Sequence, residues 1–152
     1  MSENTSWKPG RGKLGLLKPL MGHWIAEADS PMGPLVCTRH FAYTLGGTFI
    51  EMRVNWTFET KSYEETALFG IKDDAPTFWS FTSDGKQSQG TLSDGTDVHP
   101  QAICFEAQMP AGIARMIYWP GEEGTLNWAV ESKTQKGWNR FTEHRYKRKP
   151  EP

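Results

Sequence analysis

Residues 48–59, Thr-Phe-Ile-Glu-Met-Arg-Val-Asn-Trp-Thr-Phe-Glu, decide the fold of this chain. Apolar side chains recur at every second position of this stretch. They are Ile50, Met52, Val54, Trp56 and Phe58. The positions between them carry Phe49, Glu51, Arg53, Asn55 and Thr57. Because successive side chains of a strand point to opposite faces, the stretch predicts a β-strand with one buried face.

The same alternation recurs along most of the chain and predicts ten strands. Their expected ranges are 23–29, 35–44, 48–59, 62–72, 77–83, 87–93, 102–109, 113–119, 125–133 and 138–148. Short turns rich in Gly, Asp and Pro separate them, as hairpins require. No helical stretch is long enough for a parallel crossover. The pattern favours an all-β, closed or nearly closed antiparallel up-and-down barrel, which leaves no exposed sheet edge. A two-sheet sandwich is the alternative.

The length of 152 residues indicates one domain. We expect a flexible lead over residues 1–14, the barrel over 15–148 and a short tail over 149–152. Leu16, Leu17, Leu20 and Met21 surround Pro19 and predict a single helical turn. Such a turn could plug one end of the barrel.

Charge and composition exclude several classes of partner. The chain has 17 basic and 18 acidic side chains and a net charge of −1, which disfavours nucleic acid. No apolar run is long enough to cross a membrane and no secretion signal is evident, so we expect a cytoplasmic protein. Cys37 and Cys104 stand alone and are expected to be buried, reduced thiols.

Several short motifs, taken in order, resemble those of a known family. They are Gly22-x-Trp24, Gly46–Ile50, Phe69–Asp73, Trp79 with Ser83–Gly85, and Trp138 with Glu143–Arg148. This series resembles a bacterial family of calycin-like barrels of unknown function, distantly related to lipocalins, fatty-acid-binding proteins and nitrobindin. The resemblance implies a lipocalin-like barrel over about residues 20–148. It also implies that Trp24 packs against a basic residue of the last strand, Arg145 or Arg140, to close one end.

A barrel of this size has room inside for side chains or one small ligand. The chain shows no nucleophile elbow, phosphate loop, dinucleotide fingerprint or metal-ligand spacing. We therefore predict a binding protein for a small, mostly apolar molecule, with no catalytic residue, metal or cofactor, and leave a homodimer open. The expected ligand-binding residues are His144, Tyr146, Tyr63, Trp56, Phe58, Phe69, Phe105 and Tyr118.

The last strand suggests the polarity of that ligand. Residues 142–147 are similar in position to the Arg-x-Tyr of fatty-acid-binding proteins, which holds a ligand carboxylate. Here His144 replaces the arginine before Tyr146. A mostly neutral imidazole is a weaker anion clamp than a permanent guanidinium, which favours a neutral or weakly polar ligand. The sequence further predicts that His144 and Tyr146 share a face with Arg140 and Trp138.

Two alternatives remain. The first is a haem-binding barrel similar to nitrobindin, with His144 as the proximal ligand. The second is an enzyme of unknown substrate that uses Glu51, Arg53 and His144, with Glu106 or Arg115 nearby. That enzyme would need these groups to converge in one pocket. The competing interpretation of the charged residues is cross-strand pairs on the surface, which we favour.

Overall fold

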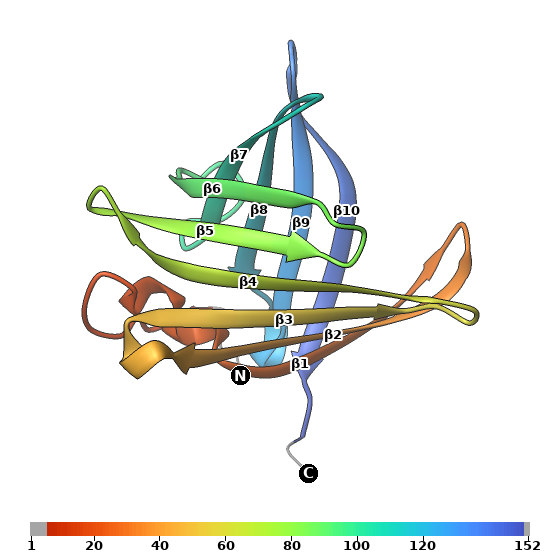
Figure 1. Cartoon of the computed structure of the whole chain (residues 1–152), viewed down its shortest axis with the longest axis horizontal. Helices are drawn as coiled ribbons and strands as arrows, with labels where there is room; N and C mark the ends of the chain where they lie inside the picture. Colours follow the sequence, from red (N-terminus) through yellow and green to blue (C-terminus); the bar gives the residue numbers. More distant parts are fainter. Residues whose placement is uncertain (1–5, 151–152) are drawn as a thin grey trace.

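A computed structural model describes residues 6–150, in which ten strands form one closed antiparallel barrel (Figure 1). The strands are β1 (Gly22–Ser30), β2 (Gly33–Thr44), β3 (Phe49–Thr57), β4 (Ser62–Lys72), β5 (Ala75–Thr82), β6 (Gln87–Ser93), β7 (Ile103–Met109), β8 (Gly112–Pro120), β9 (Leu126–Thr134) and β10 (Gly137–Arg148). Three short 3₁₀ turns accompany them: η1 (Gly15–Leu20), η2 (Leu45–Gly47) and η3 (Glu122–Gly124). The predicted barrel is confirmed.

Each strand pairs with its neighbours in sequence, and β1 pairs with β10 to close the sheet. The closing seam is short, with Trp24 opposite Arg148 and Ile25 opposite Lys147. By contrast, β1 and β2 pair along their whole lengths. The sandwich alternative is therefore excluded, because its two sheets would not join at this seam.

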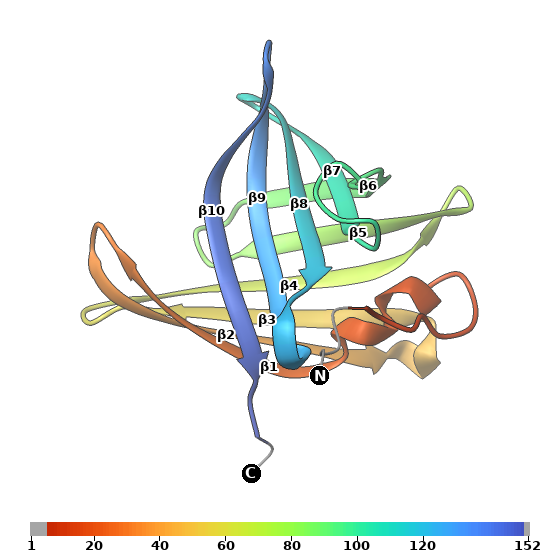
Figure 2. The ribbon, with the colours of Figure 1, turned by 180° about the vertical axis from the view of Figure 1, so that it is seen from behind.

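The barrel has two different ends (Figures 1 and 2). Strands β2–β5 cross β8–β10 at a steep angle, and the interior lies between these two layers. The turns β1–β2, β3–β4, β5–β6, β7–β8 and β9–β10 all lie at one end, which we call the hairpin end. The opposite end carries η1 and both termini of the described chain, and we call it the plug end.

The turn η1 fills the plug end, as the sequence predicted. Leu17 and Leu20 are fully buried in the core. The indole nitrogen of Trp24 donates a hydrogen bond of 2.8 Å to the carbonyl of Leu20. Because the indole is buried, this bond ties the plug to the first strand. Trp7, in the expected flexible lead, exchanges two hydrogen bonds of 2.8 Å with the Gln101 side chain, so this part of the lead is attached to the barrel.

The basic residue that closes this end is Arg148. Its guanidinium carbon lies 3.9 Å from the centre of the Trp24 ring, and its two terminal nitrogens donate to the carbonyls of Met21 and Pro19. The expectation of Arg145 or Arg140 in this role was wrong. Arg145 is exposed and bonds to Asn127, since it alternates with the inward residues of β10.

An irregularity in β10 changes which residues share a face. Arg140 pairs with Glu131, but Thr142 pairs with Val130, so one extra residue is inserted between them. Such a bulge reverses the alternation of side chains. Trp138 and Arg140 consequently lie on the outer face, whereas His144 and Tyr146 point inward. The expectation that all four share a face was wrong.

The inner face carries the apolar side chains that the alternation predicted. Ile50, Met52 and Val54 of β3 are buried. Phe69 packs edge-to-face on Phe105, with ring centres 5.3 Å apart, and tilted against Phe41 and Phe78. Cys37 and Cys104 are both buried and free. Within residues 6–150 no helix has the length and apolar character needed to cross a bilayer.

Candidate functional site

An arginine lies inside the barrel. Arg39 belongs to β2, where Leu35, Cys37 and Phe41 share its inward face, and only 1% of its surface is exposed. Its Nε donates to the hydroxyl of Tyr146 over 3.2 Å, and its Nη1 donates to the hydroxyl of Tyr118 over 2.9 Å. The closure of the sheet around β2 thus removes a permanently charged group from water.

Aromatic rings surround the Arg39 guanidinium. Its central carbon lies 4.5 Å from the ring centre of Trp128, 5.2 Å from that of Tyr146 and 5.7 Å from that of Tyr118. Such contacts attract a cation through the negative faces of the rings. They fix the guanidinium in position, but they bring no formal negative charge.

No carboxylate of residues 6–150 forms an ion pair with Arg39. The acidic side chain that acts on it electrostatically is Glu65, whose carboxylate accepts a 2.5 Å hydrogen bond from Ser80. Burial raises the pKa of Tyr118 to about 12, and burial also raises the pKa of Tyr146 well above its usual value. Both phenols are therefore neutral, and the Arg39 charge is left without a counter-ion in contact.

A second buried arginine of the described chain, Arg115, is paired with carboxylates. It points to the outer face of β8 and donates to Glu131 over 2.9 Å and to both oxygens of Asp97 over 3.0 and 2.7 Å. Arg140 also bonds to Glu131, over 2.8 Å. Two carboxylates thus neutralise Arg115, which marks the unpaired Arg39 as different.

Three buried polar atoms in the interior lack a hydrogen-bond partner among the described residues. They are Nη2 of Arg39, Nε1 of Trp128 and Nδ1 of His144. Buried polar groups in proteins are normally paired, and each exception calls for an explanation. The three residues are neighbours, because Arg39 lies over Trp128 and the ring centres of Trp128 and His144 are 5.2 Å apart. We call them the interior polar cluster.

His144 is the titratable member of this cluster. Burial, together with the nearby charge of Arg39, lowers the pKa of its imidazole below the usual value. The ring is therefore neutral at physiological pH, with one nitrogen that donates and one that accepts. This imidazole can adapt its tautomer to a bound group.

The predicted ligand-binding residues do not all lie in one place. His144, Tyr146 and Tyr118 meet at Arg39, and Phe69 and Phe105 belong to the aromatic core. Trp56 and Tyr63 are half-buried, with ring centres 5.3 Å apart, near the hairpin end. Phe58 follows the end of β3, where Lys61 lies 5.9 Å from its ring centre. Phe58 is therefore not brought to the cluster.

Sequence reasoning missed Arg39, although a signal was present. Its position has the same parity as Leu35, Cys37 and Phe41 in an alternating strand, so it shares their face. The sequence predicts that His144 replaces the arginine that accompanies the tyrosine in fatty-acid-binding proteins. Yet Tyr146 does have an arginine partner, because Arg39 of β2 contacts it. The interior contains a guanidinium after all.

The residues considered for an enzyme do not converge. Glu51 and Arg53 form a 3.5 Å ion pair on the outer surface, and Arg115 also points to the outer face. Glu106 accepts a 2.8 Å hydrogen bond from Ser93, its neighbour across the outer sheet face. His144 points inward, so the expected grouping was wrong. Glu51 and Arg53 do pair on the surface, but within β3 and not across two strands as the favoured interpretation had it.

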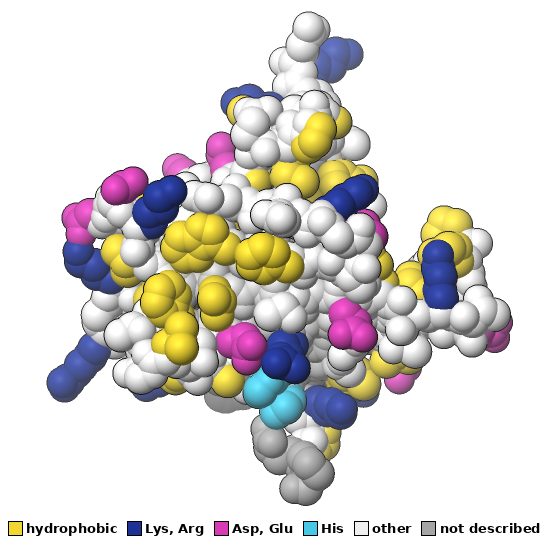
Figure 3. All heavy atoms as spheres, viewed as in Figure 1, with side chains coloured by type: hydrophobic (Ala, Val, Ile, Leu, Met, Phe, Trp, Pro, Cys, Tyr) yellow, Lys and Arg dark blue, Asp and Glu magenta, His cyan; other side chains and the backbone are white. Residues whose placement is uncertain are grey.

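The outer face of β2–β5 also carries apolar side chains (Figure 3). Phe81 is exposed on this face, and the ring centres of Phe49 and Trp79 are 6.3 Å apart. Tyr43, near the end of β2, and Leu45, in η2, are exposed as well. A face of this kind is a common place for protein contacts. The expectation of a homodimer stays a prediction.

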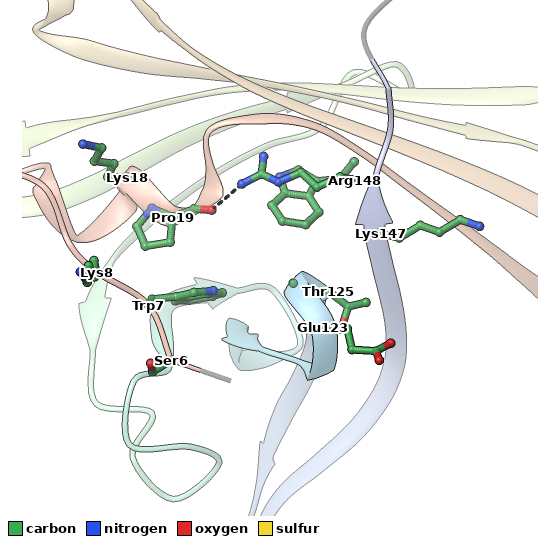
Figure 4. A pocket seen from close by; sticks show the side chains of 11 residues that line it. Ser6, Trp7, Lys8, Lys18, Pro19, Glu123, Thr125, Lys147 and Arg148 are labelled. Atoms are coloured by element: carbon green, nitrogen blue, oxygen red, sulfur yellow. Dashed lines mark hydrogen bonds between the residues drawn. The ribbon is translucent and has the colours of Figure 1, made fainter. Parts of the chain in front are cut away.

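A hollow of about 440 Å³ opens outside the plug end (Figure 4). Trp7, Trp24, Lys18 and Arg148 are among its lining residues. Figure 4 shows the guanidinium of Arg148 turned toward the Pro19 carbonyl, while Lys147 points away. This arginine already serves the closure of the barrel. The hollow shares none of the residues predicted to bind a ligand.

The chain matches no model of a known protein family and no curated protein. Its sequential, closed ten-stranded barrel is consistent with a calycin-like fold. Membership of the bacterial family stays a prediction. Among the described residues, no group of three or more His, Cys, Asp or Glu side chains is arranged to hold a metal.

The contrast between the two buried arginines gives a stability prediction. Arg39→Met removes an unpaired buried charge, while Tyr146 keeps Cys37 and Tyr118 keeps two methionine sulfurs as partners. We expect its free energy of unfolding to stay within about 1 kcal/mol of wild type. Arg115→Met leaves Glu131 and Asp97 without this cation and should cost about 3 kcal/mol. Urea denaturation measures both, and equal losses would contradict this interpretation.

The lowered pKa of His144 predicts a pH dependence of stability. The unfolded chain binds a proton at about 6.5, whereas the folded protein binds it only at lower pH. Between these values the unfolded state holds more protons, so the free energy of unfolding falls as pH is lowered through this window. His144→Gln should lose less stability over the same range. Urea denaturation at neutral and mildly acidic pH measures this loss for both proteins. If wild type and His144→Gln lose the same stability, His144 is not a buried neutral imidazole.

Proposed function

We propose that this protein binds a small, mostly apolar organic molecule inside the barrel, with the polar end of the molecule on the interior polar cluster. The observation that carries the proposal is the Arg39 guanidinium, buried with Nη2 unpartnered and no carboxylate in contact. Burial of a charge carries a desolvation cost, which the phenol hydrogen bonds and aromatic rings around Arg39 offset only in part. A ligand that accepts from Nη2 would recover part of that cost.

The surroundings of Arg39 support an apolar body for the ligand. Val54 lies directly opposite Arg39 on the inner face, and Met52 and Met116 contact the hydroxyl of Tyr118. Val130 continues this lining toward the hairpin end, beside Met116 on the neighbouring strand. Methionine side chains are flexible and adapt to different shapes. The lining can therefore rearrange around a guest.

The hairpin end offers the route of entry. Trp56, Tyr63, Met116 and Val130 are only half-buried, whereas the plug end is closed by fully buried leucines and by Trp24. A guest that enters here would pass apolar side chains before it reaches Arg39. The arrangement favours an amphipathic molecule with its polar group innermost.

Native mass spectrometry and calorimetry test this function. Freshly purified protein should carry extra mass that is lost on denaturation, and the protein should bind at least one of 1-decanol, decanoate and decylamine. Met116→Trp, which fills the lining, should abolish binding. Ile113→Trp, on the outer face of the same strand, is the matched control and should bind as wild type does. If wild type binds none of the three compounds and carries no extra mass, the proposal is wrong.

Haem binding is the second candidate, and the inward, neutral imidazole of His144 favours it. A neutral imidazole with a buried, unpartnered nitrogen fits the axial ligand of a haem iron. Bound haem would supply redox or gas-binding chemistry, while this chain would supply His144 and the apolar surroundings. Addition of hemin should then give a Soret band that His144→Ala loses. An unchanged absorbance spectrum would remove this candidate.

A further inference from the structure

We infer that the preferred ligand is a monocarboxylic acid, bound as its anion through Arg39 and Trp128. This inference rests on the proposed binding function and specifies the chemical class of the ligand. It follows from the donors that the interior presents, from the charge they leave uncompensated and from their mutual placement.

The free groups of the cluster are mainly donors. A guanidinium nitrogen and an indole nitrogen can only donate hydrogen bonds. Nη2 of Arg39 and Nε1 of Trp128 are therefore satisfied only by an acceptor. A carboxylate accepts through both of its oxygens and donates nothing, whereas an ammonium group could not accept at all and would be repelled by Arg39. The donor set excludes amines as preferred ligands.

The charges inside the barrel favour one negative charge in contact with Arg39 over two. Tyr118 and Tyr146 are neutral, burial raises the pKa of the Cys37 thiol, and burial lowers the pKa of His144. Arg39 is thus the cation of this group, and Glu65, which follows Val54 across the same inner face, acts on it without forming an ion pair with it. A ligand carboxylate would give Arg39 a counter-ion in contact, whereas a hydroxyl would not. A phosphate monoester carries about −1.5 to −2 at neutral pH and would leave excess negative charge in a buried place close to Glu65.

The neighbouring residues hold the donors in a fixed geometry. Tyr146 and Tyr118 use the Nε and Nη1 atoms of Arg39, so Nη2 is the nitrogen left for a ligand. The guanidinium stacks 4.5 Å over the Trp128 ring, which brings the indole and guanidinium into one cluster. His144 adjoins Trp128, and its Nδ1 can donate to the second oxygen in the appropriate tautomer. Little reorganisation is needed when the anion arrives.

Calorimetry with matched head groups tests the inference. The compounds are decanoate, 1-decanol and decyl phosphate, and the same three head groups on a naphthylmethyl body. Because a hydrogen bond to a charged group is the stronger kind, decanoate or its naphthyl counterpart should bind at least about tenfold tighter than the matching alcohol and phosphate. The Arg39→Met variant should bind the carboxylate no more tightly than the alcohol. Its affinity for the alcohol should stay close to that of wild type.

Two further variants complete the design. Trp128→Phe removes one hydrogen-bond donor but keeps an aromatic ring. It should weaken carboxylate binding several-fold and leave alcohol binding unchanged. This variant also tests the inference if Arg39→Met does not fold. Arg53→Met removes an exposed arginine from the outer face and is the matched control, with no change expected for any compound. The ¹³C signal of a labelled bound carboxylate should show that it stays ionised to lower pH than the free acid.

The outcomes separate this inference from the proposed function. Equal affinity for alcohol and carboxylate in wild type would overturn the carboxylate assignment and leave the binding function standing. Tightest binding of the phosphate would overturn it in favour of a dianion. If none of the compounds binds, with either the decyl or the naphthylmethyl body, both the carboxylate assignment and the proposed binding function are wrong.

Discussion

The seam between β1 and β10 is the constraint on which the rest of the structure depends. It joins the sheet over a short stretch that includes Trp24 opposite Arg148, and side-chain contacts reinforce it. Arg148 lies on the Trp24 ring and reaches two carbonyls of the plug, while the Trp24 indole bonds to a third. An antiparallel sheet that failed to close here would expose two edges and its inner face to water. Closure is what turns the inner face into an enclosed interior.

Enclosure changes the chemistry of Arg39. On an open sheet its guanidinium would be hydrated, whereas inside the barrel it depends on phenols, aromatic faces and a methionine sulfur. Arg115, on the outer face, meets two carboxylates and is fully used in stabilising the connection before β7 and the strands around β8. The same residue type therefore serves two purposes. Arg115 is neutralised by carboxylates of the protein, whereas Arg39 has no carboxylate in contact among the described residues, and we propose that a ligand supplies one.

Much of the fold could be predicted because strand alternation is a local property. The ten strands, the hairpins between them and the buried face of β3 all follow from residue spacing and from turn residues. The inward orientation of Tyr118, Phe69 and Phe105 follows in the same way once the barrel is closed. The bulge between Arg140 and Thr142 breaks this reasoning, since one inserted residue moves Trp138 and Arg140 to the opposite face from His144. Alternation within a strand cannot reveal such an insertion, because the bulge is defined by pairing with β9.

The sequence by itself determined the all-β class, the number and order of strands, and the presence of an aromatic-rich face, because these depend on neighbours a few residues apart. Only the tertiary structure decided which arginine closes the barrel and which one lies inside it. Arg39 meets Tyr118 and Tyr146 across 79 and 107 positions of the chain, and Arg148 meets Met21 across 127. Contacts over such separations depend on the register of the whole closed sheet. The polarity of the interior was therefore beyond the reach of any local pattern.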